Sequence, residues 1–168
     1  MKETPTGDEA SQGSSECELA TMSLVVFLVL TIGGGLLVGF ATRPGEWYVK
    51  LSKPWFTPPN SVFAPVWTLL YVMIAIAGWR MFIRDPLGAT MIVWAVALAL
   101  NFIWSPIFFR LHRPAAALFV ILALLAMITA FIALSWPEDA LSALLFAPYA
   151  VWVVFATILN ASIWRLNG

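Results

Sequence analysis

Five runs of about 20 or more mainly apolar residues, separated by charged residues and prolines, make up most of this 168-residue chain. A run of that length crosses a bilayer as a helix, because in lipid the backbone must satisfy its own hydrogen bonds. Hydrophobic residues form 61% and charged residues 11% of the chain, against about 45–50% and 25% in soluble proteins. The predicted helices span 23–42, 58–82, 86–109, 114–135 and 137–166. The sequence therefore predicts an all-α membrane protein, a bundle of five transmembrane helices.

The starts of three helices carry local signals. Thr57 and Asp85 each precede a proline in the position of an N-cap, and Ser135 with Glu138 fits a capping box. These signals place the helix starts at or next to the prolines.

The first 22 residues differ from the rest of the chain. They carry five acidic residues and one basic residue and contain no apolar run, so they lack the pattern of a cleavable signal peptide. We expect a disordered acidic tail over 1–22 and one membrane domain over 23–168. Cys17 is the only cysteine, which excludes a disulfide within the chain.

Basic residues are unevenly divided between the two sides that this topology defines. The side of the N-terminus has Lys2, Arg80 and Arg84, and the other side has Arg43, Lys50, Lys53, Arg110, Arg113 and Arg165. Because cytoplasmic loops carry the excess of Lys and Arg, the second side is predicted to be cytoplasmic. We expect an integral multi-pass protein with a non-cytoplasmic N-terminus and a cytoplasmic first loop and C-terminus.

The loop between the first two helices combines bulky aromatic residues with prolines. It contains Trp47, Tyr48, Pro54, Trp55, Phe56, Pro58 and Pro59. Prolines stiffen the backbone, and amphipathic rings suit a lid that covers an apolar pocket. The alternative is an interfacial belt, because Trp and Tyr gather at headgroup level in membrane proteins.

Aromatic and polar residues recur at helical spacing below this loop. They are Trp67 and Tyr71 in the second helix, Asn101, Trp104 and Ser105 in the third, and Tyr149 and Trp152 in the fifth. Prolines 65, 106 and 148 lie in the same helices and release backbone carbonyls at membrane depth. We predict that these residues line one pocket for a flat, apolar ligand. The alternative is packing between helices, which we favour for Trp94 and Ala156.

Other functional classes find no support in the sequence. Acidic residues lie in the tail, the loops or the helix ends, so we expect no buried carboxylate or charge pair for ion-coupled transport. His112 is the single histidine, and no metal-ligand spacing or standard catalytic set is present. We therefore expect no metal, no required cofactor and no nucleic-acid partner.

Gly35 and Gly39 fit a small-xxx-small helix contact, a weak indication of a homodimer.

Three segments resemble the translocator protein family, TspO/MBR, also called peripheral-type benzodiazepine receptors. They are WYVKLSKPWFTPPNSVFAPVWTLLY at 47–71, LALNFIWSPIFF at 98–109 and PYAVWVVFATILNASIWR at 148–165, and the resemblance covers roughly residues 24–167. It implies a five-helix bundle that binds porphyrins such as protoporphyrin IX and haem-type tetrapyrroles, sterols and benzodiazepine-type drugs under the first loop, and that forms dimers. The implied pocket residues are Tyr48, Trp67, Asn101, Trp104, Tyr149 and Trp152.

Two positions depart from the family pattern. Phe56 replaces the tryptophan that usually follows KPx, and the final LNASIWR has Ala161 and Ser162 where the cholesterol motif needs a tyrosine. The resemblance thus favours a membrane receptor or carrier-like protein for porphyrins over a sterol-binding protein. It also implies a second hypothesis, a light-dependent porphyrin-degrading enzyme that uses Trp67 and Trp152. A third hypothesis is a purely structural membrane protein.

Overall fold

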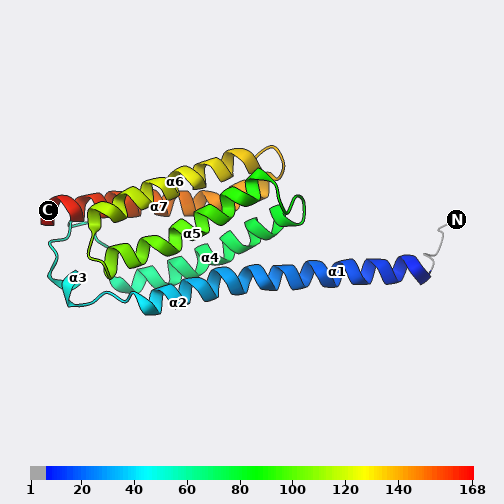
Figure 1. Cartoon of the computed structure of the whole chain (residues 1–168), viewed down its shortest axis with the longest axis horizontal. Helices are drawn as coiled ribbons and strands as arrows, with labels where there is room; N and C mark the ends of the chain where they lie inside the picture. The colour runs from blue at the N-terminus through cyan, green and yellow to red at the C-terminus, as the bar shows by residue number, and fades with distance from the viewer. Residues whose placement is uncertain (1–6) are drawn as a thin grey trace.

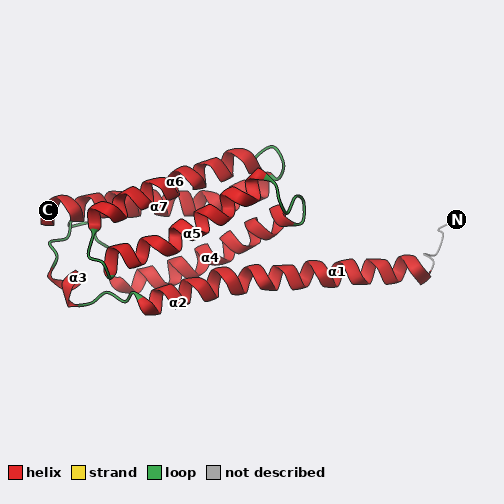
Figure 2. Ribbon diagram, viewed as in Figure 1, coloured by secondary structure: helices red, strands yellow, loops and turns green. Residues whose placement is uncertain are grey.

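A computed structural model describes the backbone of residues 7–168 and the side chains of residues 18–168. Every described element is helical, as Figure 2 shows. The elements are α1 (Gly7–Leu28), the π-helical turn η1 (Val29–Gly33), α2 (Gly34–Ala41), α3 (Glu46–Lys50), α4 (Asn60–Phe82), α5 (Ala89–Phe109), α6 (Pro114–Ser135) and α7 (Ala140–Asn167).

Five helices are long and apolar enough to span a membrane, which confirms the predicted fold class. The first span, Glu18–Ala41, runs without a break through α1, η1 and α2, and α4 to α7 provide the other four. The short helix α3 lies in the first loop and was not anticipated from the sequence.

The N-terminal boundary differs from the prediction of a disordered tail over 1–22. Residues 1–6 lie outside the described part, but α1 begins at Gly7, sixteen residues before the predicted start. No proline interrupts the chain between Pro5 and Pro44. Once the membrane span is helical, each residue added at its end gains a hydrogen bond without a new nucleation step, so the helix extends into the acidic segment.

Three helices begin two or three residues later than predicted. The side chains that the sequence suggested as caps bond elsewhere: Thr57 Oγ1 donates to the Pro54 carbonyl (2.7 Å), and Ser135 Oγ donates to the Phe131 carbonyl (2.7 Å). Asp85 Oδ1 accepts from the Leu87 amide (3.3 Å) within a turn. Because these groups complete turns or the preceding helix, α4, α5 and α7 start at Asn60, Ala89 and Ala140.

The helices form a bundle with two different ends (Figure 1). Helix α6 packs against α5 and α7, α7 packs against α4, and the first span lies along α4 and α5. Helix α3, the α5–α6 turn and the C-terminus gather at one end, and the α4–α5 and α6–α7 turns lie at the other, beyond which α1 projects. The six basic residues grouped from the sequence therefore belong to one end.

The centre of the bundle is closely packed. Trp94 lies against Gly78, where a side chain would overlap its indole, and its Nε1 donates to the Ile74 carbonyl (3.0 Å). The rings of Phe131 and Phe146 stack 3.9 Å apart between α6 and α7. Trp94 is thus a packing residue, the role favoured for it from the sequence.

A salt bridge closes the bundle at the end opposite α3. Arg80 donates from Nε to Asp139 Oδ2 (2.7 Å) and from Nη2 to Oδ1 (2.9 Å), and Ser142 Oγ also donates to Oδ2 (2.7 Å). Asp139 is only 8% exposed. The expectation of no buried carboxylate or charge pair was therefore wrong, because two residues at helix ends far apart in the sequence meet between α4 and α7.

Hydrogen bonding from Arg80, with a further bond from Ser142, holds the pKa of Asp139 at about 2, below its ordinary 3.8, despite the opposing effect of burial. Folding therefore favours the ionised form of Asp139. Its contribution to the free energy of unfolding is complete above about pH 4 and is lost as the pH falls toward 2.

We expect Asp139→Asn to lower the free energy of unfolding by roughly 2 kcal/mol at neutral pH. The exposed neighbour provides a control, Glu138→Gln, which should change little. Thermal unfolding in detergent, followed by circular dichroism from about pH 5 to about pH 2.5, should show a smaller loss in the Asp139 variant than in the parent. If the melting temperatures of the parent and of Asp139→Asn fell equally over this pH range, the salt bridge would contribute nothing to the free energy of unfolding.

Candidate ligand-binding cavity

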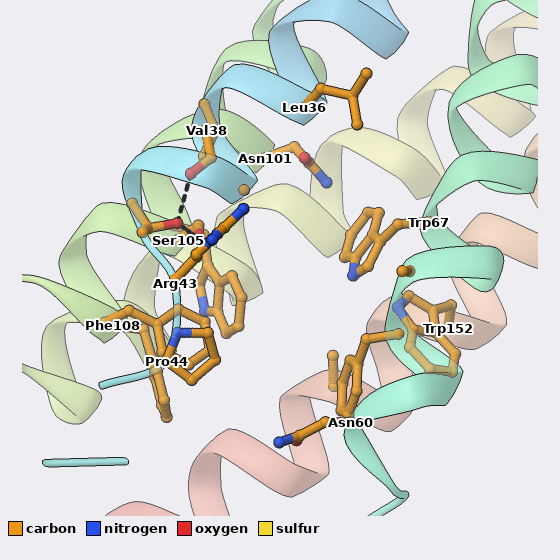
Figure 3. A pocket seen from close by; sticks show the side chains of 18 of the residues that line it. Leu36, Val38, Arg43, Pro44, Asn60, Trp67, Asn101, Ser105, Phe108 and Trp152 are labelled. Atoms are coloured by element: carbon orange, nitrogen blue, oxygen red, sulfur yellow. Dashed lines mark hydrogen bonds between the residues drawn. The ribbon is translucent and has the colours of Figure 1, made fainter. Parts of the chain in front are cut away.

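A cavity of about 600 Å³ opens between four of the membrane spans at the α3 end of the bundle. Its walls come from the first span near α2, from the α3 segment, and from α4, α5 and α7, whereas no residue of α6 lines it. Figure 3 shows side chains from these elements around a common space.

Most of the predicted ligand-binding residues line this cavity. They are Tyr48, Trp67, Tyr71, Asn101, Trp104, Ser105 and Trp152. Tyr149 does not line the cavity, because it is 1% exposed and lies within the core behind Asn101. Ala156, for which packing was favoured, also lines the cavity.

Aromatic rings form one wall. Trp67 stacks on Tyr71 with ring centroids 5.5 Å apart and stands nearly perpendicular to Trp152 at 6.5 Å. Phe63, one helical turn before Trp67, meets Trp152 edge to face at 5.8 Å. The rings of α4 and α7 thus hold one another in fixed orientations and present a rigid apolar surface.

A chain of side-chain hydrogen bonds crosses the inner part of the cavity wall. Tyr71 Oη donates to Asn101 Oδ1 (2.9 Å), and Asn101 Nδ2 donates to Tyr149 Oη (2.8 Å). The free-energy cost of an amide at membrane depth is therefore offset by partners on α4 and α7. Asn101 joins three helices and also faces the cavity.

Two further polar contacts fix the wall formed by α5. Trp104 Nε1 donates to Asn160 Oδ1 (3.1 Å), and Asn160 Nδ2 donates to the Pro114 carbonyl (2.8 Å). Ser105 shares a hydrogen bond of 2.6 Å with Thr42, just after α2. These bonds tie α5 to α7 and to the end of the first span.

Only part of the first loop covers the cavity. Tyr48 in α3 is 6% exposed and packs edge to face on Phe109 (5.4 Å), while the Lys53 ammonium lies 4.6 Å from its ring centroid. Burial raises the pKa of the Tyr48 phenol, so it stays neutral. Pro44 and Asn60 line the cavity beside it.

The remaining lid residues take other positions. Trp47 stacks on His112 of the α5–α6 turn at 4.3 Å, Phe56 packs against Phe155 at 6.3 Å, and Trp55 is 95% exposed. None of the predicted lid residues Trp47, Pro54, Trp55, Phe56, Pro58 and Pro59 lines the cavity. The expectation that the aromatic rings of this loop cover a pocket therefore holds for Tyr48 but not for Trp47 or Trp55, because α3 directs Tyr48 inward and Trp47 toward the α5–α6 turn.

Several lining residues were missed from the sequence. They include Thr42, Arg43, Pro44, Asn60, Phe63, Phe108 and Phe155. Helical spacing offered a signal for two of them, since Phe63 is one turn before Trp67 and Phe108 one turn after Trp104. Nothing in the sequence pointed to Arg43, because its position depends on where the first span ends relative to α5.

The two glycines predicted to make a dimer contact have different surroundings. A methyl group on Gly35 would overlap the Tyr71 ring, whereas one on Gly39 would meet no atom within 4 Å. Both positions line the cavity. Gly35 therefore allows α2 to approach α4 within one chain, and the homodimer stays a prediction.

Among residues 18–168, no cluster of three His, Cys, Asp or Glu side chains is arranged to hold a metal ion. The lining residues of the cavity are neutral apart from Arg43. The geometry thus suits an apolar organic molecule better than an ion.

A family model and the relatives found by sequence comparison agree on one protein family. The TspO/MBR family model matches residues 25–165. Protein CrtK of Rhodobacter capsulatus is 38% identical over 151 residues, covering 88% of this chain and 93% of the relative. The tryptophan-rich sensory protein of Cereibacter sphaeroides is 34% identical, covering 86% and 92%, and the human translocator protein is 36% identical, covering 79% and 83%.

The contrast between Gly35 and Gly39 is testable with matched substitutions in α2. We expect Gly35→Ala to destabilise the fold by about 1–3 kcal/mol, because the new methyl displaces the Tyr71 ring from its bond with Asn101. Gly39→Ala should be neutral or stabilising by up to about 1 kcal/mol, since alanine favours helix and the site is open. Thermal unfolding of both variants in detergent measures the difference. Equal melting temperatures would contradict the close approach of α2 and α4.

Proposed function

This chain belongs to the TspO/MBR family of membrane proteins, and from that premise we propose that it is a receptor that binds porphyrins in the cavity beneath α3. The ligand class includes protoporphyrin IX, haem-type tetrapyrroles and similar flat apolar molecules. Acting by binding, the protein serves tetrapyrrole transport or the regulation of a stress response. The name of the relative in Cereibacter sphaeroides, a sensory protein, supports a receptor role.

One observation carries this proposal: a cavity of about 600 Å³ whose wall is built from mutually oriented tryptophan, tyrosine and phenylalanine rings. Cavities of roughly 300–1,000 Å³ with apolar walls and a few polar groups bury small organic ligands. Flat π-systems gain most from such walls, because rings stack or meet edge to face. A porphyrin has the required flatness and apolar area.

The residues that line the cavity also favour ligand binding over ion-coupled pumping as its function. No carboxylate lines the cavity among the described residues. The buried carboxylate that the fold does contain, Asp139, is engaged by Arg80 at the other end of the bundle. Ligand uptake therefore rests on apolar burial and not on coupling to a proton or cation.

A second candidate function is light-dependent porphyrin degradation. It is favoured by the position of Trp67 and Trp152, which both line the cavity and lie 6.5 Å apart. Illumination of the porphyrin complex separates the two functions, since degradation yields a new chromophore and binding alone returns the porphyrin unchanged.

We expect Trp67→Ala and Trp152→Ala each to weaken protoporphyrin IX binding by roughly 1–3 kcal/mol, because each removes an aromatic wall of the cavity. A matched control is Trp136→Ala in the α6–α7 turn, where the indole is 57% exposed and remote from the cavity. Titration of purified protein in detergent, read by quenching of tryptophan fluorescence, gives the affinities. Unchanged binding in both cavity variants would place the porphyrin elsewhere.

We also propose that the end bearing α3 faces the cytoplasm. Five of the basic residues at this end, Arg43, Lys50, Lys53, Arg110 and Arg113, lie in or beside short connections, where the charge bias acts most strongly. The N-terminus is then non-cytoplasmic.

Impermeant thiol labelling of intact cells tests this orientation. The native Cys17 should react, whereas Leu111→Cys in a Cys17→Ser background should react only after the membrane is permeabilised. The opposite pattern would reverse the topology.

A further inference from the structure

One charged side chain contributes to the cavity, that of Arg43. It follows the last residue of α2 by two positions and is exposed at the rim. Its guanidinium carbon lies 4.6 Å from the ring centroid of Phe40, which also lines the cavity. The cation is thus positioned by the end of the first span and faces the same space as the aromatic wall.

Arg43 has no carboxylate partner within the part of the chain whose side chains are described. The ion pairs in that part are Lys50 with Glu46 (3.7 Å) and Arg80 with Asp139 (2.7 Å). Glu46, three residues after Arg43, pairs with Lys50. The guanidinium retains its donors for a group that comes from outside the protein.

Arg43 lies across the cavity from part of the aromatic wall. Figure 3 shows Arg43 and Ser105 on one side of the space and Trp67 and Trp152 across from them. Thr42 adds a hydroxyl next to Ser105. A ligand that matches both sides has a flat apolar body and an anionic group at one edge.

From this arrangement we propose that Arg43 binds a carboxylate of the ligand, so that the cavity selects flat apolar acids over neutral molecules of the same shape. A guanidinium forms two parallel, charge-assisted hydrogen bonds with a carboxylate, a geometry that neither a hydroxyl nor an ester reproduces. Because Arg43 lies at the rim, the acid group stays partly hydrated while the apolar body is buried, which avoids the cost of burying a charge. The inference rests on the proposed function and specifies which porphyrins the site takes.

A phospholipid phosphate offers Arg43 a similar anionic partner. Measurements in a non-ionic detergent without phospholipid separate the two sources, because the lipid is then absent while a ligand carboxylate is still present. If Arg43 serves only the headgroups, its replacement will not alter the preference for acids.

The test compares protoporphyrin IX, which has two carboxylates, with its dimethyl ester, which has the same ring and no charge. We expect the parent protein to bind the acid about tenfold more tightly than the ester. In Arg43→Gln the affinity for the acid should fall by about tenfold, while the affinity for the ester should change by less than about twofold. Arg43→Lys keeps the charge without the planar fork and should give an intermediate preference. Arg113→Gln, at an exposed arginine of the same end that does not line the cavity, should match the parent.

Each outcome has a distinct meaning. Equal affinities for acid and ester in the parent, with no change in Arg43→Gln, would overturn the assignment of Arg43 and leave porphyrin binding intact. Absence of binding for both ligands in the parent would overturn the proposed function and the inference with it. Circular dichroism melting of Arg43→Gln, expected to match the parent because the side chain is exposed, excludes a folding defect as the cause.

Discussion

The carboxamide of Asn101 is the interaction on which the arrangement of the site depends. It accepts from Tyr71 on α4 and donates to Tyr149 on α7, so that one residue of α5 joins three helices at membrane depth. An unpaired amide there would cost free energy, and this penalty makes the relative positions of the three helices specific. Gly35 extends the same constraint to the first span, because its missing side chain allows α2 to approach the Tyr71 ring.

The two ends of the bundle are closed in different ways. At one end Arg80, Asp139 and Ser142 tie α4 to α7 through short charge-assisted bonds. At the other end the same two helices line the cavity with aromatic rings, and the cavity is covered by Tyr48, whose helix α3 contacts the α5–α6 turn. The salt bridge thus fixes α4 and α7 relative to each other at the end remote from the cavity.

In the function that we propose, different residues of the cavity provide affinity and selectivity. Its aromatic wall supplies apolar area, while its polar atoms are largely engaged in bonds between helices, such as those of Trp104 with Asn160 and of Ser105 with Thr42. Recognition of a polar group on the ligand therefore falls to the residue that the protein leaves unpaired at the rim, Arg43. Affinity and selectivity then come from different parts of the site.

The sequence by itself determined the fold class and seven of the residues that line the cavity. Apolar length identified the five spans, and helical spacing placed Trp67 with Tyr71 and Asn101 with Trp104, because hydrophobicity and periodicity are local properties of a chain in lipid. Tertiary structure alone decided which loop residue covers the cavity. Tyr48 is buried against Phe109 because α3 docks on α5, whereas Trp55 stays exposed. It also decided the meeting of Arg80 with Asp139, the burial of Tyr149 behind Asn101 and the position of Arg43 at the rim. Each of these depends on the approach of segments far apart in sequence, and no local pattern encodes that approach.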